Sequence, residues 1–150
     1  MSTQKIIIGG CGNMAKKWAQ YAKARTDVSI VGLVDIKKEN AERFAADQGI
    51  SAPAFTDIED ALSATKADIV FDITIPEAHK NIALAAFKHG AHVFGEKPMA
   101  ASIADAKKMV AAAQRAGKMY AVMQNRRFLK NIRAFRELIS SGSIGDIGLV

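Results

Sequence analysis

Cysteine is almost absent from this chain, which has one, Cys11, among its 150 residues. A single cysteine cannot form an internal disulfide, and it offers no cluster of thiolates for a metal ion. Cys11 lies at a variable position of a glycine-rich turn, where we expect it to serve as a small residue. The alternative is a reactive thiol, because a helix N-terminus can lower the pKa of a cysteine.

Long apolar runs are also missing. No run approaches the roughly 20 residues that a membrane-spanning helix needs. The N-terminus has one lysine and three isoleucines before its first glycines, which is too short for a signal peptide. We therefore expect a cytoplasmic protein with no membrane partner.

Acidic residues are outnumbered, with 15 Asp and Glu against 21 Lys and Arg, which gives a net charge of +6. Such an excess raises nucleic-acid binding as a possible function. The positive charges are spread along the chain, however, and no aromatic residues are regularly interleaved with the densest group. We expect a solvated helix face, an attraction for an anionic cofactor and no nucleic-acid partner. The densest group consists of Arg126, Arg127, Lys130, Arg133 and Arg136.

A glycine turn after a buried strand is the most informative feature that the chain does have. The consecutive isoleucines Ile6 to Ile8 are typical of a buried strand. Gly10, Gly12 and Ala15 then complete the pattern G-x-G-x-x-[G/A]. The first glycine permits a tight turn, the second lets a pyrophosphate approach the backbone, and the alanine lets the following helix pack closely. The N-terminus of that helix favours phosphate, although the pattern alone also fits a structural turn.

An acidic residue ends the second expected strand. The strand Val28 to Val34 is followed by Asp35, about 20 residues beyond the glycines, where a carboxylate can accept hydrogen bonds from an adenosine ribose. Asp35 could instead cap the helix from Lys37 onward, and the two roles do not exclude each other. The carboxylate favours NAD over NADP because it would repel a 2′-phosphate. Lys37 and Lys38 could offset that repulsion, so NADP stays possible.

The rest of the chain alternates helices and strands within a length that fits one domain. Helices are expected over 14–22, 37–48, 56–62, 77–88, 103–116 and 128–140, and further strands over 54–55, 68–74, 91–95 and 119–124. This alternation predicts an α/β Rossmann fold, a doubly wound six-stranded parallel sheet of order 3-2-1-4-5-6 with helices on both faces. Ligands bind such sheets at the carboxyl ends of the strands. Those ends carry Gly10 to Met14, Asp35, Thr74 to Pro76, Glu96 to Lys97 and Gln124 to Asn125.

Lys97 is the candidate catalytic residue. It follows the 91–95 strand and lies between Glu96 and Pro98, and a proline restricts the backbone of the residue before it. A lysine at this edge of the sheet would lie near a nicotinamide, where acid–base chemistry is useful. The alternative is a surface lysine that merely pairs with Glu96.

Four motifs follow one another along the chain: Gly10-Cys-Gly-Asn-Met-Ala15, Pro76-Glu-Ala-His79, Gly90-Ala-His-Val-Phe-Gly-Glu-Lys-Pro98 and Asn125-Arg-Arg-Phe128. Together they resemble the glucose–fructose oxidoreductase/inositol dehydrogenase/MocA family over nearly the whole chain. The resemblance implies hydride transfer between NAD(P) and a hydroxyl or carbonyl of a sugar, cyclitol or similar small molecule. It also implies that Lys97 is the proton donor or acceptor. We expect no bound metal ion. The implied cofactor-binding residues are Gly10, Gly12, Asn13, Met14, Asp35, Ile36, Thr74, Ile75, Pro76, His79, Glu96, Lys97, Asn125 and Arg126.

The C-terminal part departs from the family pattern. Leu129 and Lys130 follow Phe128, where family members often have a proline. The family has a second, sheet-rich domain with most of the substrate contacts, and Gly142-Ser-Ile-Gly145 resembles the crossing into it. We therefore expect a Rossmann domain over 1–141 and the start of a second domain at 142–150. The chain would then be an inactive cofactor-binding part of a longer, homo-oligomeric enzyme, and a natural small protein is the alternative.

Two other functions stay open beside an oxidoreductase. One is a non-catalytic dinucleotide-binding or regulatory module, and the other is S-adenosylmethionine binding, against which the Glu96-Lys97-Pro98 segment speaks. If a domain is missing, an apolar patch should be exposed and should favour self-association. The candidate residues for this patch are Phe128, Leu129, Ile144, Ile147, Leu149 and Val150.

Overall fold

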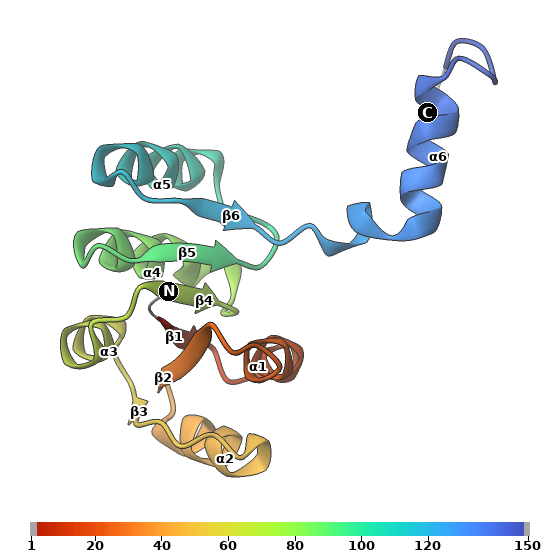
Figure 1. The fold of residues 1–150 in the computed structure, drawn as a ribbon. Coiled ribbons are helices and arrows are strands. Elements are labelled where there is room, and N and C mark those ends of the chain that lie inside the picture. Colours follow the sequence, from red (N-terminus) through yellow and green to blue (C-terminus); the bar gives the residue numbers. More distant parts are fainter. Residues whose placement is uncertain (1–2, 149–150) are drawn as a thin grey trace.

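A twisted parallel sheet forms the centre of the computed structural model, which describes residues 3–148. The six strands are ordered β3-β2-β1-β4-β5-β6, and every neighbouring pair is parallel. The predicted Rossmann fold and its strand order are thereby confirmed (Figure 1). The strands are β1 Gln4–Gly9, β2 Val28–Val34, β3 Ala54–Phe55, β4 Ile69–Asp72, β5 His92–Gly95 and β6 Tyr120–Val122.

Helices cover both faces of the sheet, and local sequence signals set several of their ends. The Asp57 and Ser102 side chains accept hydrogen bonds from the first turns of α3 and α5. Gly49 and Gly117 end α2 and α5 in the left-handed conformation, with φ of 59° and 62°. The helices of the sheet are α1 Ala15–Lys23, α2 Lys38–Gln48, α3 Ile58–Thr65, α4 Pro76–Lys88 and α5 Ile103–Ala116.

Each face of the sheet has its own apolar core, which explains the consecutive isoleucines. Ile6 and Ile8 pack with α1 and α2 on one face, whereas Ile7 belongs to the core formed with α3, α4 and α5. All three isoleucines are buried. A central strand of a parallel sheet is covered on both sides, so it needs apolar residues in succession rather than in alternation.

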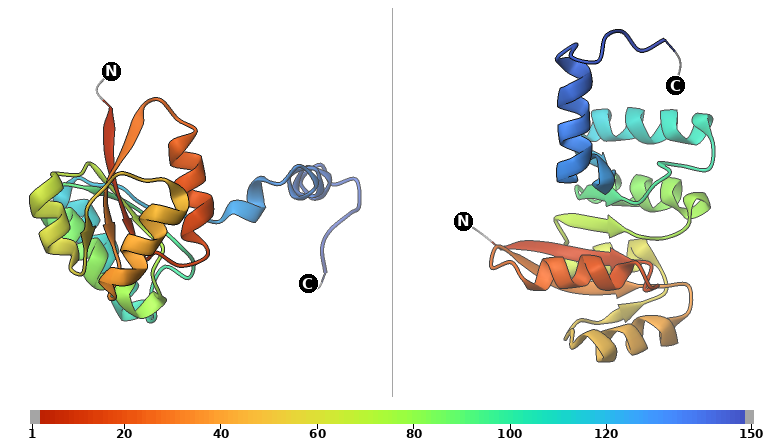
Figure 2. Two further views of the ribbon diagram at one scale, coloured as in Figure 1. Left: turned by 90° about the horizontal axis from the view of Figure 1, so that it is seen from below. Right: turned by 90° about the vertical axis from the view of Figure 1, so that its right-hand side faces the viewer.

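The C-terminal helix differs from its predicted extent. The sequence predicts one helix over 128–140, but Asn125–Phe128 forms a short 3-10 helix, η1, and α6 spans Lys130–Ser140. Leu129 separates them with an extended backbone and provides no side-chain cap. Figure 2 shows that η1 and α6 leave the sheet and extend away from it. Neither element has a buried residue.

The apolar residues expected in a C-terminal patch are exposed where the structure describes them. Phe128, Leu129, Ile144 and Ile147 are each at least half exposed. Leu149 and Val150, which complete the predicted patch, lie outside the described residues. Self-association through this patch stays a prediction. Within residues 3–148, every helix is too short or too polar to cross a membrane.

Candidate functional site

The carboxyl ends of four neighbouring strands bring the predicted site segments to one edge of the sheet. The Gly10 N–H donates to the Val34 carbonyl at 2.8 Å, and the Ile73 N–H donates to the Gly9 carbonyl at 2.8 Å. The Glu96 N–H donates to the Asp72 carbonyl at 2.9 Å. The glycine turn, Asp35, the Thr74 turn and Glu96 therefore follow the ends of the neighbouring strands β1, β2, β4 and β5 at one edge of the sheet (Figure 1).

The glycine turn has room for a ligand at one glycine and none at the other. Gly10 has a φ of 86°, and a Cβ on it would lie 2.7 Å from the Ile73 carbonyl oxygen. A side chain there would meet both backbone strain and a clash. A Cβ on Gly12 would meet nothing within 4 Å, so the backbone at this point faces open space. This open cradle at the start of α1 fits the pyrophosphate of a dinucleotide.

Asp35 is held by donors from both sides of the edge. Its Oδ2 accepts the Cys11 N–H at 3.1 Å, while its Oδ1 accepts the Lys37 N–H and the Asn40 side-chain amide, each at 3.1 Å. The capping contact with the start of α2 is thus present, and the carboxylate still lies beside the glycine turn. Asn40 was not singled out by the sequence, because only the folded turn shows that it reaches Asp35.

Cys11 is a weak candidate for a reactive thiol. Burial, followed by the negative charge of Asp35, raises the pKa of the Cys11 thiol to about 12. The thiol therefore stays protonated and unreactive near neutral pH. The interpretation as a small residue of the turn is the one that this environment supports.

The turn after β4 rests on a buried polar pair. Asp72 and His79 are both fully buried, with 2.8 Å between Asp72 Oδ2 and His79 Nδ1. The Thr74 hydroxyl donates to Asp72 Oδ1 at 2.6 Å. The family resemblance implies that His79 lines the cofactor. The structure places its ring fully buried against Asp72, next to the turn that carries Thr74, Ile75 and Pro76, and the cofactor contact stays a prediction.

Glu96 and Lys97 form an ion pair at the same edge. Lys97 Nζ lies 3.5 Å from Glu96 Oε2, and the lysine side chain is 49% exposed against 14% for the glutamate. The other carboxylate oxygen, Oε1, accepts the Trp18 indole N–H at 3.0 Å. The sequence treats Trp18 only as part of the apolar face of a helix, so this contact was missed. The Lys97 side chain is therefore open to solvent, whereas the Glu96 side chain has a partner on each carboxylate oxygen.

Apolar side chains around this edge are left uncovered by the fold. Met14, Ile36 and Ile75, all predicted to bind cofactor, belong to the exposed large hydrophobic residues. Asn13 is exposed as well. The three hydrophobic residues follow the ends of β1, β2 and β4, at the edge where open α/β sheets bind ligands.

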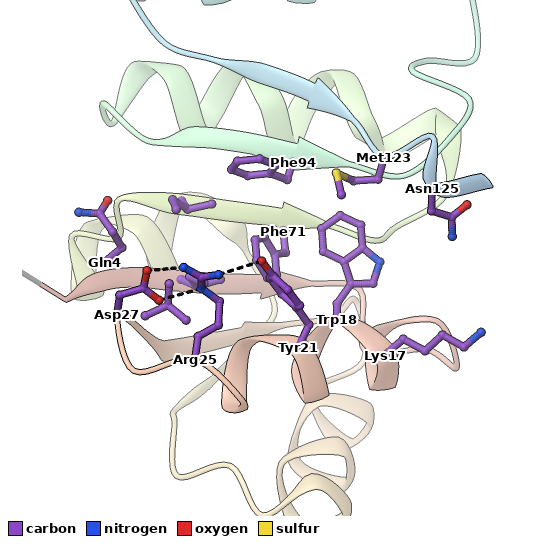
Figure 3. A pocket seen from close by; sticks show the side chains of 13 residues that line it. Gln4, Lys17, Trp18, Tyr21, Arg25, Asp27, Phe71, Phe94, Met123 and Asn125 are labelled. Atoms are coloured by element: carbon purple, nitrogen blue, oxygen red, sulfur yellow. Dashed lines mark hydrogen bonds and ion pairs between the residues drawn. The ribbon is translucent and has the colours of Figure 1, made fainter. Parts of the chain in front are cut away.

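A groove runs beside the edge on the face that carries α1. It has a volume of about 590 Å³, and Figure 3 shows Trp18, Tyr21, Phe71, Phe94 and Met123 around it. Asn125 closes the end near the strand termini, while Arg126 follows it in η1. Neither the glycine turn nor Lys97 lines this groove. Within residues 3–148, no group of three His, Cys, Asp or Glu side chains could hold a metal ion.

Known oxidoreductases are similar to this chain in sequence. The family described as "Oxidoreductase family, NAD-binding Rossmann fold" matches residues 4–124. The 1,5-anhydro-D-fructose reductase of Ensifer adhaerens is 32% identical over 136 residues, which cover 91% of this chain and 40% of the relative. The D-glucoside 3-dehydrogenase of Escherichia coli (strain K12) is 31% identical over 147 residues, which cover 97% of this chain and 42% of the relative.

Solved structures share the fold over nearly the whole chain. The WlbA dehydrogenase from Bordetella pertussis, in complex with NADH and UDP-GlcNAcA, matches with a TM-score of 0.87 and 26% identity, over 95% of this chain and 42% of that one. An oxidoreductase from Agrobacterium radiobacter, in complex with NAD+, L-tartaric acid and magnesium, matches with a TM-score of 0.86 and 25% identity, over 97% and 42%. The chain spans about two fifths of the length of the curated relatives it matches.

Proposed function

We propose a function from one premise: the chain belongs to the oxidoreductase family with an NAD-binding Rossmann fold, the glucose–fructose oxidoreductase/inositol dehydrogenase/MocA family. The family that the motifs predict is thereby confirmed, and NAD is its cofactor. The further proposal is that the whole protein transfers hydride between NAD and a hydroxyl or carbonyl of a sugar, cyclitol or similar molecule. In this reaction Lys97 is the proton donor or acceptor.

The juxtaposition of Lys97 with the glycine turn and Asp35 supports this proposal most strongly. The glycine turn would receive the pyrophosphate, Asp35 an adenosine ribose, and Glu96 would border the nicotinamide. When bound, NAD supplies the hydride chemistry. The remaining proposed cofactor contacts are Asn13, Met14, Ile36, Thr74, Ile75, Pro76, His79, Asn125 and Arg126.

Lys97 has the chemistry that the reacting oxygen requires. An ammonium group can donate a proton to a carbonyl oxygen that is being reduced, and the amine can accept one from a hydroxyl that is being oxidised. The ion pair with Glu96 keeps the lysine Nζ at the sheet edge. Its exposed side chain leaves space for a substrate beside it.

The substrate class rests on the relatives. Two of them are named as a 1,5-anhydro-D-fructose reductase and a D-glucoside 3-dehydrogenase, and their names point to polyhydroxylated compounds. Because these relatives are more than twice as long as the matched region, we propose that residues 142–150 lead into a substrate-binding domain. We also propose that the whole protein is a homo-oligomer.

The test replaces the lysine without touching the cofactor cradle. Lys97→Met is expected to keep the dissociation constant for NADH, measured by calorimetry, within a factor of about two. In the whole protein it should lower kcat at least about 100-fold, because general acid–base groups contribute on that scale. Lys88→Met is the matched control, since Lys88 pairs with Glu59 on the surface. Unchanged turnover in Lys97→Met rejects the role of the lysine.

A non-catalytic dinucleotide-binding module is the second candidate. It is favoured by one observation: Lys97 does not line the groove that lies beside the cofactor edge. NADH binding without any turnover of sugar, cyclitol or related substrates by the whole protein would establish this alternative.

A further inference from the structure

The only tryptophan of the chain reaches the residue next to Lys97. Trp18 lies on α1, the helix whose N-terminus follows the glycine turn. Its indole N–H donates to Glu96 Oε1, and Glu96 Oε2 faces Lys97 Nζ at 3.5 Å. One carboxylate therefore has a separate partner on each oxygen. The tryptophan is 78 residues away in sequence, and the lysine is its direct neighbour.

Both ends of the contact between Trp18 and Glu96 are fixed. The Trp18 ring packs edge-on against Phe71, with 4.8 Å between ring centroids and 66° between planes. Figure 3 shows the indole beside Phe71 at one end of the groove. The Glu96 backbone is held by its hydrogen bond to the Asp72 carbonyl. A hydrogen bond to a carboxylate is about twice as strong as one between neutral groups, so this contact can select one orientation of the Glu96 side chain.

We propose that Trp18 is a positioning residue that acts through Glu96. It fixes the carboxylate at the place where the nicotinamide would lie, with one oxygen directed at Lys97. The helix that receives the phosphates then also orients the acid–base pair, so cofactor binding and the orientation of Lys97 depend on one element. This inference rests on the proposed function of Lys97 and adds a residue to which that proposal gives no role.

A purely structural role makes a different prediction. If Trp18 only fills space beside Phe71, phenylalanine should replace it without any effect on Glu96. If it acts through its N–H, removing the donor should resemble removing the charge of the acceptor. Trp18→Phe and Glu96→Gln therefore form the two sides of a double-mutant cycle.

The first measurement needs no cofactor. Because the chain has one tryptophan, a ¹⁵N-labelled sample gives a single indole N–H signal in an NMR spectrum. We expect this signal to lie at a different chemical shift in Glu96→Gln, because a neutral amide then replaces the charged acceptor of the indole N–H. An indole signal at the same position in both proteins shows that the contact is not formed, and it overturns the proposal.

The second measurement is the dissociation constant for NAD+, determined by calorimetry. Trp18→Phe and Glu96→Gln should each raise it about five-fold, the scale of one charge interaction at about 4 Å in water. The double variant should also raise it only about five-fold, because the two changes remove one arrangement. Tyr21→Phe is the matched control, since Tyr21 lies on the same helix and its hydroxyl interacts with Arg25 instead.

The outcomes separate this proposal from the proposed function. Two outcomes contradict the positioning role and leave the function of Lys97 intact. One is a double variant whose dissociation constant for NAD+ rises about 25-fold, the product of the two single effects, and the other is an unchanged dissociation constant in Trp18→Phe. Failure of the unaltered chain to bind NAD+ contradicts the proposed function and the positioning role together, while the indole signal in Glu96→Gln still decides the contact itself. If Trp18→Phe changes the circular dichroism spectrum, Trp18→Leu takes its place in the cycle.

Discussion

Two helices of equal length show how differently the two regions of this molecule use their apolar residues. Helices α2 and α6 each have 11 residues. In the Rossmann body (residues 3–124), α2 buries Ala41 and Phe44 against the sheet. In the C-terminal arm (residues 125–148), α6 buries none of its residues. The family match also ends at residue 124, so the boundary seen in burial coincides with the boundary seen in sequence.

The difference teaches that an amphipathic pattern specifies a helix face but not what covers it. Ile132, Phe135 and Leu138 follow helical spacing on α6, and all three are exposed. Most helical stability in proteins comes from packing of the apolar face. The body supplies such packing to each of α1 to α5, whereas the arm has none within the described residues. Stability should therefore respond strongly to changes in the body and hardly at all to changes in the arm.

The largest expected contrast comes from one substitution made in both regions. Phe44→Ala on α2 removes a ring that is 3% exposed and should lower the free energy of unfolding by about 3–5 kcal/mol. Phe135→Ala on α6 removes one that is 58% exposed and should change it by less than about 0.5 kcal/mol. Urea unfolding followed by circular dichroism measures both. Equal losses in the two variants would show that the arm packs as firmly as the body.

A smaller contrast is expected at two glycines with similar backbone angles. Gly10 has a φ of 86° and Gly142 in the arm a φ of 73°. Gly10→Ala should lower the free energy of unfolding by about 3 kcal/mol. The backbone strain of a positive φ adds to a clash, because the new Cβ would lie only 2.7 Å from the Ile73 carbonyl oxygen. Gly142→Ala should cost about 1 kcal/mol at most, because nothing lies within 4 Å of its Cβ. Thermal unfolding of the two variants compares these costs, and a larger cost at Gly142 would contradict the account.

Much of the body could be predicted from the sequence because its signals are local. Glycine turns, the caps Asp57 and Ser102 and runs of β-branched residues each act within a few positions, and they fix the order of elements. Right-handed connections between parallel strands then determine the topology. The position of these segments at one edge of the sheet follows from that topology, so it could be predicted without the structure. That this edge binds a cofactor stays a prediction.

The parts that the sequence did not predict depend on contacts between distant side chains. Trp18 and Glu96 are 78 residues apart, and nothing in either local pattern indicates the other. The contact between Asp72 and His79 could have been predicted, because Asp72 ends a strand and His79 lies in the first turn of the next helix. The start of α6 was misplaced because Leu129 gives no capping signal, so only the folded backbone shows where the helix begins.

Acid sensitivity should also distinguish the two regions, by a smaller amount. The hydrogen bond from Lys80, at 3.1 Å, is the main cause that lowers the pKa of Asp105 below its ordinary value. A lowered pKa adds stability that is present above the pKa of the unfolded chain and is lost as the pH falls through the folded value. Lys80→Met should therefore be less stable than the parent at neutral pH, and the difference should shrink in acid.

The arm offers a control for this acid effect. Among the described residues, no ion pair involves the arm, so Lys130→Met on α6 should leave the pH dependence of unfolding unchanged. Unfolding free energies of the three proteins across acidic and neutral pH test the comparison. If the difference in unfolding free energy between Lys80→Met and the parent stays constant with pH, the ion pair with Asp105 does not cause the acid sensitivity.

The smallest expected effect is the response of the body to removal of residues 125–150. No described hydrogen bond or ion pair joins the arm to the body, and the arm has no buried residue. The shortened chain should therefore unfold within about 0.5 kcal/mol of the parent. The same deletion should abolish self-association in sedimentation, because it removes the exposed patch that includes Phe128, Leu129, Ile144 and Ile147. A marked loss of stability would instead show that the arm covers an apolar surface of the body in solution. The groove beside Trp18 is lined mostly by apolar side chains and is the surface to test, so Phe94→Ser would then reproduce that loss in the parent chain and have no effect on the shortened one.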